Sequence, residues 1–470
     1  MSEPLKIAFV GAGSVRYTIK LIGDLAHTED LKDVELSLMD IDPERLSATH
    51  LLVEKYITEL GREFKVQSTT NLEKALKGAD FVINLALARA ESHEDGYVQY
   101  EIVRDIGERH GYYRGIDSQE FNMVSDYYTL TNYNQLRMSL EIAKMVEKIC
   151  PDAWFLQTAN PVFEITQMIK DLTRVKVVGL CHGYAHVYEV AKTIGLNPER
   201  LTWQVAGVNH AIWLNRFEFE GMNAYRFLDK WIESNSHKWE PKDPWNVDLS
   251  PAAIDMYRLY GMLPIGDTVR CGTWKYHYNL EIKRRWYGKF GGIDNEIERP
   301  RFYEQLRKTR KMLLGLANKL QQNRSLMLTQ IMPDIFTKDP ESKEQHIPFI
   351  NAMVNDKKTR LVLNIENKGA ISDIPDDVIV EVPVTVDKDG IHPEKIEPEL
   401  TERVKQMYLM PRILRMRWAL EAFKTGDIDV LKEILIRDPR TRSYEQVESV
   451  LKDILDLPFN REMRNHYLKY

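Results

Sequence analysis

The chain has 470 residues, with 64 basic and 70 acidic side chains and a formal net charge of −6. This length allows two or three domains with cores of ordinary size, and the balanced charge predicts no nucleic-acid partner. Three cysteines are too few for a disulfide framework and favour a reducing, cytoplasmic compartment. The first residues run straight into a strand-like segment and no long apolar span follows, so we expect a soluble, unprocessed protein without membrane contact.

The first predicted elements are a strand, a glycine turn and a helix. Residues 6–10 are rich in β-forming side chains and end in Gly11-Ala12-Gly13-Ser14, after which apolar residues recur at helical spacing. Glycines let the backbone approach a pyrophosphate, and the helix N-terminus offers N–H groups to its charge. Arg16 occupies the third glycine position of the dinucleotide-binding pattern, so the turn alone is a weak signal.

A second predicted strand, residues 34–39, ends in Asp40. An acidic residue at that edge can bind both ribose hydroxyls and disfavours a 2′-phosphate, which favours NAD over NADP. The alternatives are a turn without a ligand and an Asp40 that only caps a helix before Pro43. The predicted cofactor-binding residues are Gly11, Gly13, Ser14, Val15, Asp40 and Asn84.

Alternation of strands and helices continues to about residue 200. The predicted helices cover 43–60 and 134–149, and the predicted strands cover 65–70, 80–86, 153–161 and 176–181. This order predicts a doubly wound, parallel, Rossmann-like sheet within residues 1–200. Between 96 and 131 the chain is dense in Tyr, Arg, Asp and Asn, which is typical of a loop over a polar ligand or of a solvated surface loop.

The second half is less regular. It contains an alternating region near 203–218, a charged helix near 301–320, strands near 360–365 and 378–382, and a helical region from about 400. The mixture predicts an α+β domain, residues 201–470, that covers the exposed face of the cofactor and carries the substrate, metal and oligomer contacts.

The strand at 176–181 ends in Cys181-His182-Gly183, and Asn209-His210 follows later. Open α/β sheets bind ligands at this edge. Cys181 and His210 match no zinc-finger spacing, so a metal that they share would be assembled by the fold, with open positions that acidify substrate hydroxyls. Cys181 is otherwise a nucleophile or a packed thiol, and His210 a core histidine.

Asp267 lies in a Gly-Asp-Thr turn, with Arg270 three positions later. In a functional interpretation Asp267 is a base and Arg270 holds hydroxyl or carboxylate oxygens. In a structural interpretation Asp267 caps a helix.

With these motifs in view, the chain resembles glycoside hydrolase family 4 over nearly its whole length. The resemblance also implies a fold similar to lactate and malate dehydrogenases. The matching motifs are Gly-Ala-Gly-Ser, Asn-Met-Val-Ser-Asp, Thr-Ala-Asn-Pro, Cys-His-Gly, Gly-Val-Asn-His, Gly-Asp-Thr-Val-Arg and the Asn-Lys-Gly to Val-Glu-Val-Pro region.

The resemblance implies NAD and Mn²⁺ as cofactors, with the metal on Cys181 and His210 and on the 2- and 3-hydroxyls of a sugar. It implies oxidation at C3, removal of the C2 proton, elimination of the 1-linked group, addition of water and return of the hydride. Asp267 matches the family's base, and His182 would assist the leaving group or bind substrate. The positions that match sugar contacts are Asp126, Asn160 and Arg270.

The Cys-His-Gly motif resembles the subgroup that acts on α-uronides, and the Cys-Asn-x-Pro motif that accompanies 6-phosphosugars is absent from the sequence. Arg270, His182 and His186 are cations that could meet the sugar carboxylate. We therefore predict an α-glucuronidase, then its epimer-specific alternative, an α-galacturonidase, and third an α-glucosidase or α-galactosidase. The resemblance also implies a homodimer or homotetramer.

Two other functions remain open from the sequence. An ordinary NAD-dependent dehydrogenase would release reduced cofactor. An NAD-sensing binding protein would need neither Cys181 nor His210.

Overall fold

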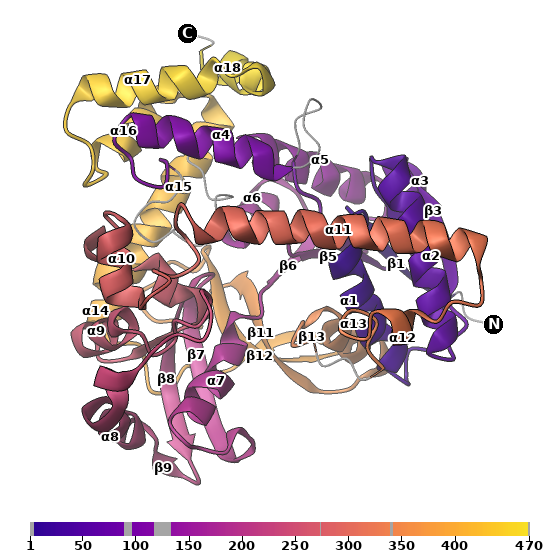
Figure 1. The fold of residues 1–470 in the computed structure, drawn as a ribbon, viewed down its shortest axis with the longest axis horizontal. Coiled ribbons are helices and arrows are strands. Elements are labelled where there is room, and N and C mark those ends of the chain that lie inside the picture. Colours follow the sequence, from indigo (N-terminus) through magenta and orange to yellow (C-terminus); the bar gives the residue numbers. More distant parts are fainter. Residues whose placement is uncertain (1–3, 89–95, 117–132, 273, 339–341, 469–470) are drawn as a thin grey trace.

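A computed structural model describes residues 4–88, 96–116, 133–272, 274–338 and 342–468. Strands from both halves of this described chain join in one 13-stranded sheet. The strand order is β10-β8-β7-β12-β11-β6-β5-β4-β1-β2-β3, with β13 on β12 and β9 on β8 (Figure 1). The fold class is therefore α/β, as the sequence predicts.

The first half forms the doubly wound part of the sheet. Its six strands are parallel: β1 Leu5–Val10, β2 Val34–Met39, β3 Lys65–Thr69, β4 Phe81–Asn84, β5 Trp154–Gln157 and β6 Lys176–Leu180. The helices between them are α1 Val15–His27, α2 Pro43–Glu59, α3 Leu72–Leu76, α4 Gly96–Arg109, α5 Tyr133–Ile149 and α6 Val162–Leu172. The predicted alternation of strands and helices is confirmed. The strands inside this part of the sheet are largely buried, whereas β3, at its edge, is partly exposed.

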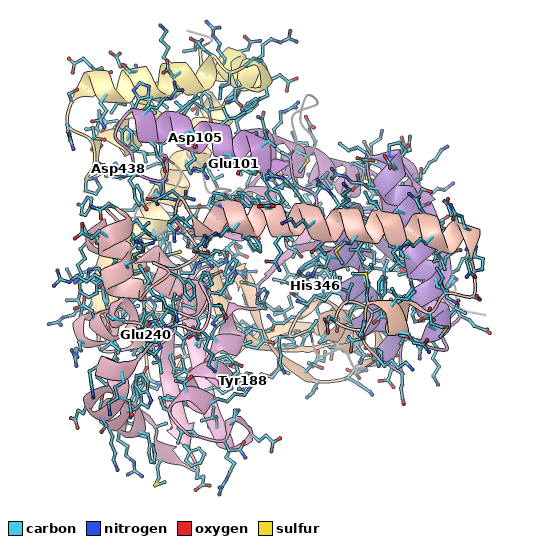
Figure 2. All side chains as sticks on the ribbon, viewed as in Figure 1. Glu101, Asp105, Tyr188, Glu240, His346 and Asp438 are labelled. Carbon is cyan, nitrogen blue, oxygen red and sulfur yellow. The ribbon has the colours of Figure 1, made fainter. Side chains whose placement is uncertain are left out.

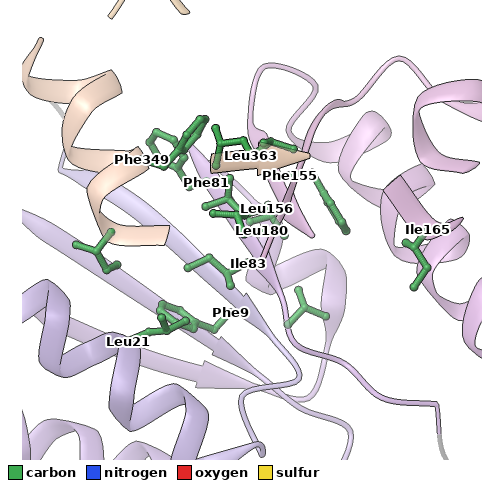
Figure 3. Packing of buried hydrophobic residues seen from close by; sticks show 14 of the residues in the cluster. Phe9, Leu21, Phe81, Ile83, Phe155, Leu156, Ile165, Leu180, Phe349 and Leu363 are labelled. Carbon is green, nitrogen blue, oxygen red and sulfur yellow. The ribbon is translucent and has the colours of Figure 1, made fainter. Parts of the chain in front are cut away.

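The core lies on both sides of these strands. Phe9, Ile83 and Leu180 come from the parallel strands β1, β4 and β6 and are buried in one cluster (Figure 3). Phe349, from α13 His346–Asn355, packs edge-on against Phe81, with ring centroids 6.4 Å apart. A helix from the second half therefore completes the core of the first.

The second half extends the same sheet with antiparallel strands. These are β7 Leu201–Val208, β8 Ala211–Phe219, β9 Met222–Asn223, β10 Leu263–Ile265, β11 Thr359–Glu366, β12 Ile379–Asp387 and β13 Gly390–Pro393. β11 pairs with β6, and β12 lies between β11 and β7. The sheet is continuous across residue 200, and the division into domains 1–200 and 201–470 stays a prediction.

The remaining helices pack on both halves of the chain. They are α7 His186–Thr193, α8 Tyr225–Asn235, α9 Pro251–Tyr260, α10 Leu280–Tyr287, α11 Glu298–Gln322, α12 Leu328–Ile331, α14 Glu402–Val404, α15 Met410–Thr425, α16 Ile428–Ile436, α17 Tyr444–Leu455 and α18 Arg461–Tyr467. Among them, α11 and α12 contact α2, and α17 contacts α4. The long helix α11 crosses the molecule from α10 to α2 (Figure 1). In the described part of the chain, no helix has the length and apolar composition needed to span a membrane.

The prediction of a loop from 96 is wrong for residues 96–109, which form α4. Tyr100, Val103 and Ile106 recur at helical spacing, and Val103 and Ile106 are buried against α16 and α17. The polar residues between them hid this periodicity. The rest of the predicted loop, residues 117–132, lies outside the described residues, and Asp126 with it.

A buried ion pair joins α15 to α6. Arg412 is fully buried, and its Nη1 lies 2.7 Å from Oε1 of Glu164. Replacing Arg412 with Met leaves a buried carboxylate without this partner, so we expect a loss of about 3–5 kcal/mol in the free energy of unfolding, measured by urea titration.

The matched control is Arg417→Met. Arg417 pairs with Asp377 at the surface, with 61% of the aspartate side chain exposed, so its loss should cost less than about 1 kcal/mol. Equal losses for the two variants would show that burial does not decide the contribution of the Arg412 pair.

Candidate active site

A cavity of about 960 Å³ lies at the carboxyl edge of the parallel strands, between α5 and α11. Its wall includes the predicted residues Gly11, Gly13, Ser14, Val15, Asp40 and Asn160. From the second half, α11 contributes Leu306, Arg307, Arg310 and Leu313. The volume falls in the range of small-molecule and cofactor sites. The predicted dinucleotide-binding residues, apart from Asn84, therefore surround one cavity.

The first turn requires glycine at two positions, because other parts of the chain lie too close to Gly11 and Gly13 for a side chain. Gly11 has φ of +87°, and a Cβ there would lie 2.6 Å from the backbone of Ala86. A Cβ on Gly13 would lie 2.5 Å from Oδ2 of Asp40. That oxygen accepts a hydrogen bond of 2.8 Å from the Gly13 N–H. The backbone itself thus forms this part of the wall.

The structure separates the two interpretations of Asp40. Arg45 N–H donates to Asp42, which caps α2, so the capping role belongs to Asp42. Asp40 stands at the cavity wall. Asn84 is different from the other predicted residues, because it is buried and hydrogen-bonds Gln157 and the Ala86 N–H. Its hydrogen bond to the Ala86 N–H helps to position Leu85 and Ala86, which line the cavity.

Cys181 and His210 come from separate halves of the chain to the same edge of the sheet. Cys181 follows β6, and His210 occupies the tight turn between β7 and β8 with φ of +59°. The side chain of Asn209, next to His210, hydrogen-bonds the Cys181 thiol. It also donates to Oε2 of Glu381 on β12 at 2.8 Å.

A backbone contact brings Asp267 to this pair. Gly266 has φ of +60°, and a Cβ on it would lie 2.7 Å from the carbonyl oxygen of Gly183. The Gly266–Cys271 turn is therefore packed on the Cys181–Gly183 turn. Oδ2 of Asp267 lies 3.4 Å from Nε2 of His210.

Arg270 holds Asp267 from the other side. Its Nη1 contacts Oδ1 of Asp267, and its Nε lies 2.8 Å from Oδ2 of Asp294. Arg270 is 4% exposed. The structure thus brings Asp267, Arg270, Cys181 and His210 together, as the sequence predicts for one site.

His182 belongs to a second group of contacts that links the site to the cavity. Its Nδ1 lies 3.3 Å from Glu344, which also pairs with Lys20 of α1 at 2.7 Å. His346 is in the interior of the molecule (Figure 2) and hydrogen-bonds Thr158 on the cavity wall. The segment 344–346 therefore contacts both the cavity wall and the Cys181 turn.

Comparison with known proteins decides the family. The profile of family 4 glycosyl hydrolases matches residues 6–196, and the profile of that family's C-terminal domain matches residues 205–441. The chain belongs to glycoside hydrolase family 4.

Two relatives illustrate the range of this family. The chain is 25% identical over 463 residues to an α-galactosidase of Bacillus subtilis (strain 168), covering 96% of each chain. It is 22% identical over 478 residues to an α-galacturonidase of Thermoanaerobacter italicus, covering 97% of this chain and 96% of the relative. This family 4 glycosidase is thus similar along its whole length to enzymes of different sugar specificity.

Solved structures agree with the fold. A 6-phospho-α-glucosidase from gut microorganisms, solved with NAD and Mn²⁺, has a TM-score of 0.74 and 16% identity, covering 96% of this chain and 98% of that chain. The lactate dehydrogenase of Eimeria maxima has a TM-score of 0.53 and 15% identity, covering 91% and 97%. The predicted likeness of the fold to lactate dehydrogenase is confirmed.

Burial and charge set the protonation of the glycosidase site. Burial lowers the pKa of His210 to about 4, so its imidazole is neutral, the form that binds metals. Burial, followed by Glu381 and Asp267, raises the pKa of the Cys181 thiol well above its usual range. Burial opposes ionisation of Asp267, but the adjacent guanidinium of Arg270 holds its pKa well below the ordinary value. Asp267 is therefore ionised at neutral pH.

The donor set fits an open metal site. Cys181 and His210 offer one sulfur and one imidazole nitrogen. Within the described ranges there is no group of three or more His, Cys, Asp or Glu side chains arranged to hold a metal. Two protein donors leave several positions to other ligands, which is typical of catalytic rather than structural sites.

Besides the metal donors, the side chain of Asn160 also indicates a ligand. Its Oδ1 is buried and accepts no hydrogen bond from any described residue. Leaving a buried acceptor unsatisfied is costly, so such atoms in native sites usually meet a ligand or water. A substrate hydroxyl would satisfy it.

All three predicted carboxylate-binding side chains have an acidic partner, and that of His182 is Glu344. Arg270 is held between Asp267 and Asp294, and Nδ1 of His186 lies 2.8 Å from Asp248. His182 keeps 56% of its side chain exposed. Of the three cations predicted for a uronate, His182 is thus the most accessible.

Sequence reasoning missed the acidic partners of the site: Asp248, Asp294, Glu344 and Glu381. Glu381 had a readable signal, since it is the one charged residue in the apolar run 378–384. A buried charge in a strand interior needs a partner or a function. The other three stand in polar surroundings, where an acidic residue carries no such signal.

The His186–Asp248 pair predicts a pH dependence of stability. Burial opposes protonation of His186, but Asp248 outweighs it and raises the pKa from 6.5 to about 9. The pair therefore stabilises the fold fully below about pH 6.5, and this contribution is lost as the pH rises towards 9. Replacing His186 with Gln should flatten the fall of the urea midpoint between pH 6.5 and 9. An unchanged slope would remove His186 from this transition.

Proposed function

We propose that this family 4 glycosidase is NAD- and Mn²⁺-dependent and cleaves α-uronides, with α-glucuronides as first candidate. The observation that carries the proposal is the meeting of Cys181, His210 and Asp267 beside the glycine-walled cavity. The related 6-phospho-α-glucosidase was solved with NAD and Mn²⁺, which supports the choice of cofactors.

In this proposal NAD occupies the cavity along Gly11, Gly13 and Asp40, and Mn²⁺ is held by Cys181 and His210. When bound, the two supply reversible oxidation at C3 of the sugar and acidification of its neighbouring hydroxyls. Asn160 accepts a hydrogen bond from a sugar hydroxyl with its free Oδ1. Asp126 remains a proposed sugar contact.

Asp267 is the proposed base for the C2 proton. The Arg270 guanidinium keeps Asp267 ionised, and the contacts with Arg270 and with the neutral His210 fix its orientation, so the carboxylate can accept a proton. A carboxylate with a lowered pKa is a weak base, which means that it can remove only an acidified C–H proton. A carbonyl at C3 makes the C2 proton acidic, and the electron pair left at C2 then expels the C1 substituent.

The uronide assignment is supported by the Cys181-His182-Gly183 motif and by His182. His182 is accessible, beside Lys20, and directly follows the metal cysteine. It is proposed to bind the substrate or to assist the leaving group. The second candidate is an α-galacturonidase, which the relative from Thermoanaerobacter italicus favours.

A panel of nitrophenyl α-glycosides tests the substrate. With NAD⁺, Mn²⁺ and thiol present, we expect turnover of the glucuronide above the galacturonide, glucoside and galactoside, without accumulation of NADH. Preference for the galacturonide would favour the second candidate. Stoichiometric NADH would instead indicate an ordinary dehydrogenase.

Hydrolysis in D₂O tests the route. The released sugar should carry deuterium at C2, because the proton that Asp267 removes exchanges with solvent before it is replaced. Product without deuterium at C2 would exclude elimination. Asp267→Asn should lower kcat by about 10²–10⁴-fold.

Cys181→Ser is the matched control for Asp267→Asn. It should weaken Mn²⁺ binding, measured by the electron paramagnetic resonance of free Mn²⁺, whereas Asp267→Asn should keep most of it. Equal Mn²⁺ affinity in Cys181→Ser and the unmodified protein would remove Cys181 from the metal site.

A further inference from the structure

Trp245 lies at the rim of the active site and has no part in the proposed chemistry. It belongs to the segment 241–250 that leads into α9, in which Val247, Asp248 and Leu249 are buried. Trp245 nevertheless keeps 39% of its surface exposed. An exposed indole beside a polar site offers an apolar face on which part of a ligand can pack.

The ring lies next to the reacting groups. The Cζ atom of Arg270 is 4.7 Å from the centroid of the Trp245 ring, and the same guanidinium contacts Asp267. The Asp267 side chain is 27% exposed and that of Arg270 4%, so the site opens to solvent at Asp267. Trp245 is therefore one side chain away from the carboxylate at which the site opens.

Neighbouring contacts hold the ring in place. Phe302 of α11 packs edge-on against it, with centroids 5.2 Å apart and planes at 76°. The backbone N–H of Trp245 donates a hydrogen bond of 2.8 Å to the Asp243 side chain. Further along the segment, Asp248 pairs with His186, which follows the Cys181 turn. A ring that is fixed before binding loses little entropy when a ligand packs on it.

We propose that Trp245 forms the leaving-group subsite, on which a ring-shaped aglycone packs. The C–H groups of a pyranose ring and the plane of a phenol both fit the electron-rich face of an indole, whereas a methyl group covers little of it. This inference rests on the proposed function, because it presupposes a glycoside substrate. It adds the chemical class of the leaving group.

The test uses three α-glycosides of the sugar that the enzyme prefers: a methyl glycoside, a phenyl glycoside and a disaccharide with a pyranose leaving group. Each is measured with the unmodified enzyme, W245A, W245F and W418A. Trp418, on α15, is the matched control, since it is also 39% exposed and has the guanidinium of Arg437 5.7 Å from its ring.

The readout is the ratio of kcat/KM for a ring-bearing substrate to that for the methyl glycoside. Loss of the Arg270 contact affects every substrate alike and cancels in this ratio. W245A should lower the ratio by about threefold to tenfold, mainly through KM, and W245F should lower it less. W418A should leave it unchanged.

A fall with only the phenyl glycoside or only the disaccharide would support the subsite and identify its ring as aromatic or sugar. An equal loss on all three substrates, or no loss, would overturn the proposal and leave Trp245 as a support for Arg270. A wrong uronide assignment would be detected separately, by the panel of nitrophenyl α-glycosides. The methyl, phenyl and disaccharide substrates would then be prepared with the sugar that the enzyme does cleave.

Discussion

The active site depends on one close contact between two backbones, that of Gly183 with Gly266. Cys181 and His182 reach the site from the last parallel strand, whereas Asp267 and Arg270 reach it after the antiparallel strand β10. The turns can meet because neither glycine presents a side chain at the contact, and Gly266 adopts a positive φ. The separation of the Cys181 turn from the Asp267 turn is therefore set by the backbone.

A series of buried ion pairs, in which acidic and basic side chains alternate, maintains this geometry. Asp267 contacts Arg270, Arg270 contacts Asp294, and Asp294 contacts Arg299. Burial alone would favour the neutral acids, yet the two arginines hold the pKa of Asp294 below its ordinary value. Each charge has a partner of opposite sign, which is the condition under which buried ions persist. The chain of pairs ends at Asp267, the most exposed carboxylate of the series.

What could be predicted from the sequence was local. Apolar runs identified most of the parallel strands, and the glycine turn and Cys181 were found because each follows such a run. Asp267 was found from its Gly-Asp-Thr turn, with Arg270 three positions later. The pairing of β6 with β11, and of β12 with β7, joins segments far apart in the chain, and strand periodicity does not specify a distant partner. Asn84 was placed inside the predicted strand 80–86, whereas the strand ends at it in the structure, and its hydrogen bond to Gln157 depends on a neighbouring strand. Helix α4 was missed because its polar residues outnumber the buried ones.

The continuous sheet also bears on how the protein is made. During synthesis the first half can pair six parallel strands, but the outer edge of β6 waits for β11, which begins at Thr359. β7 likewise waits for β12. Unpaired edges invite association with other chains. The growing polypeptide therefore carries these two open edges until β11 and β12 have been synthesised, and chaperone protection would matter most over that interval.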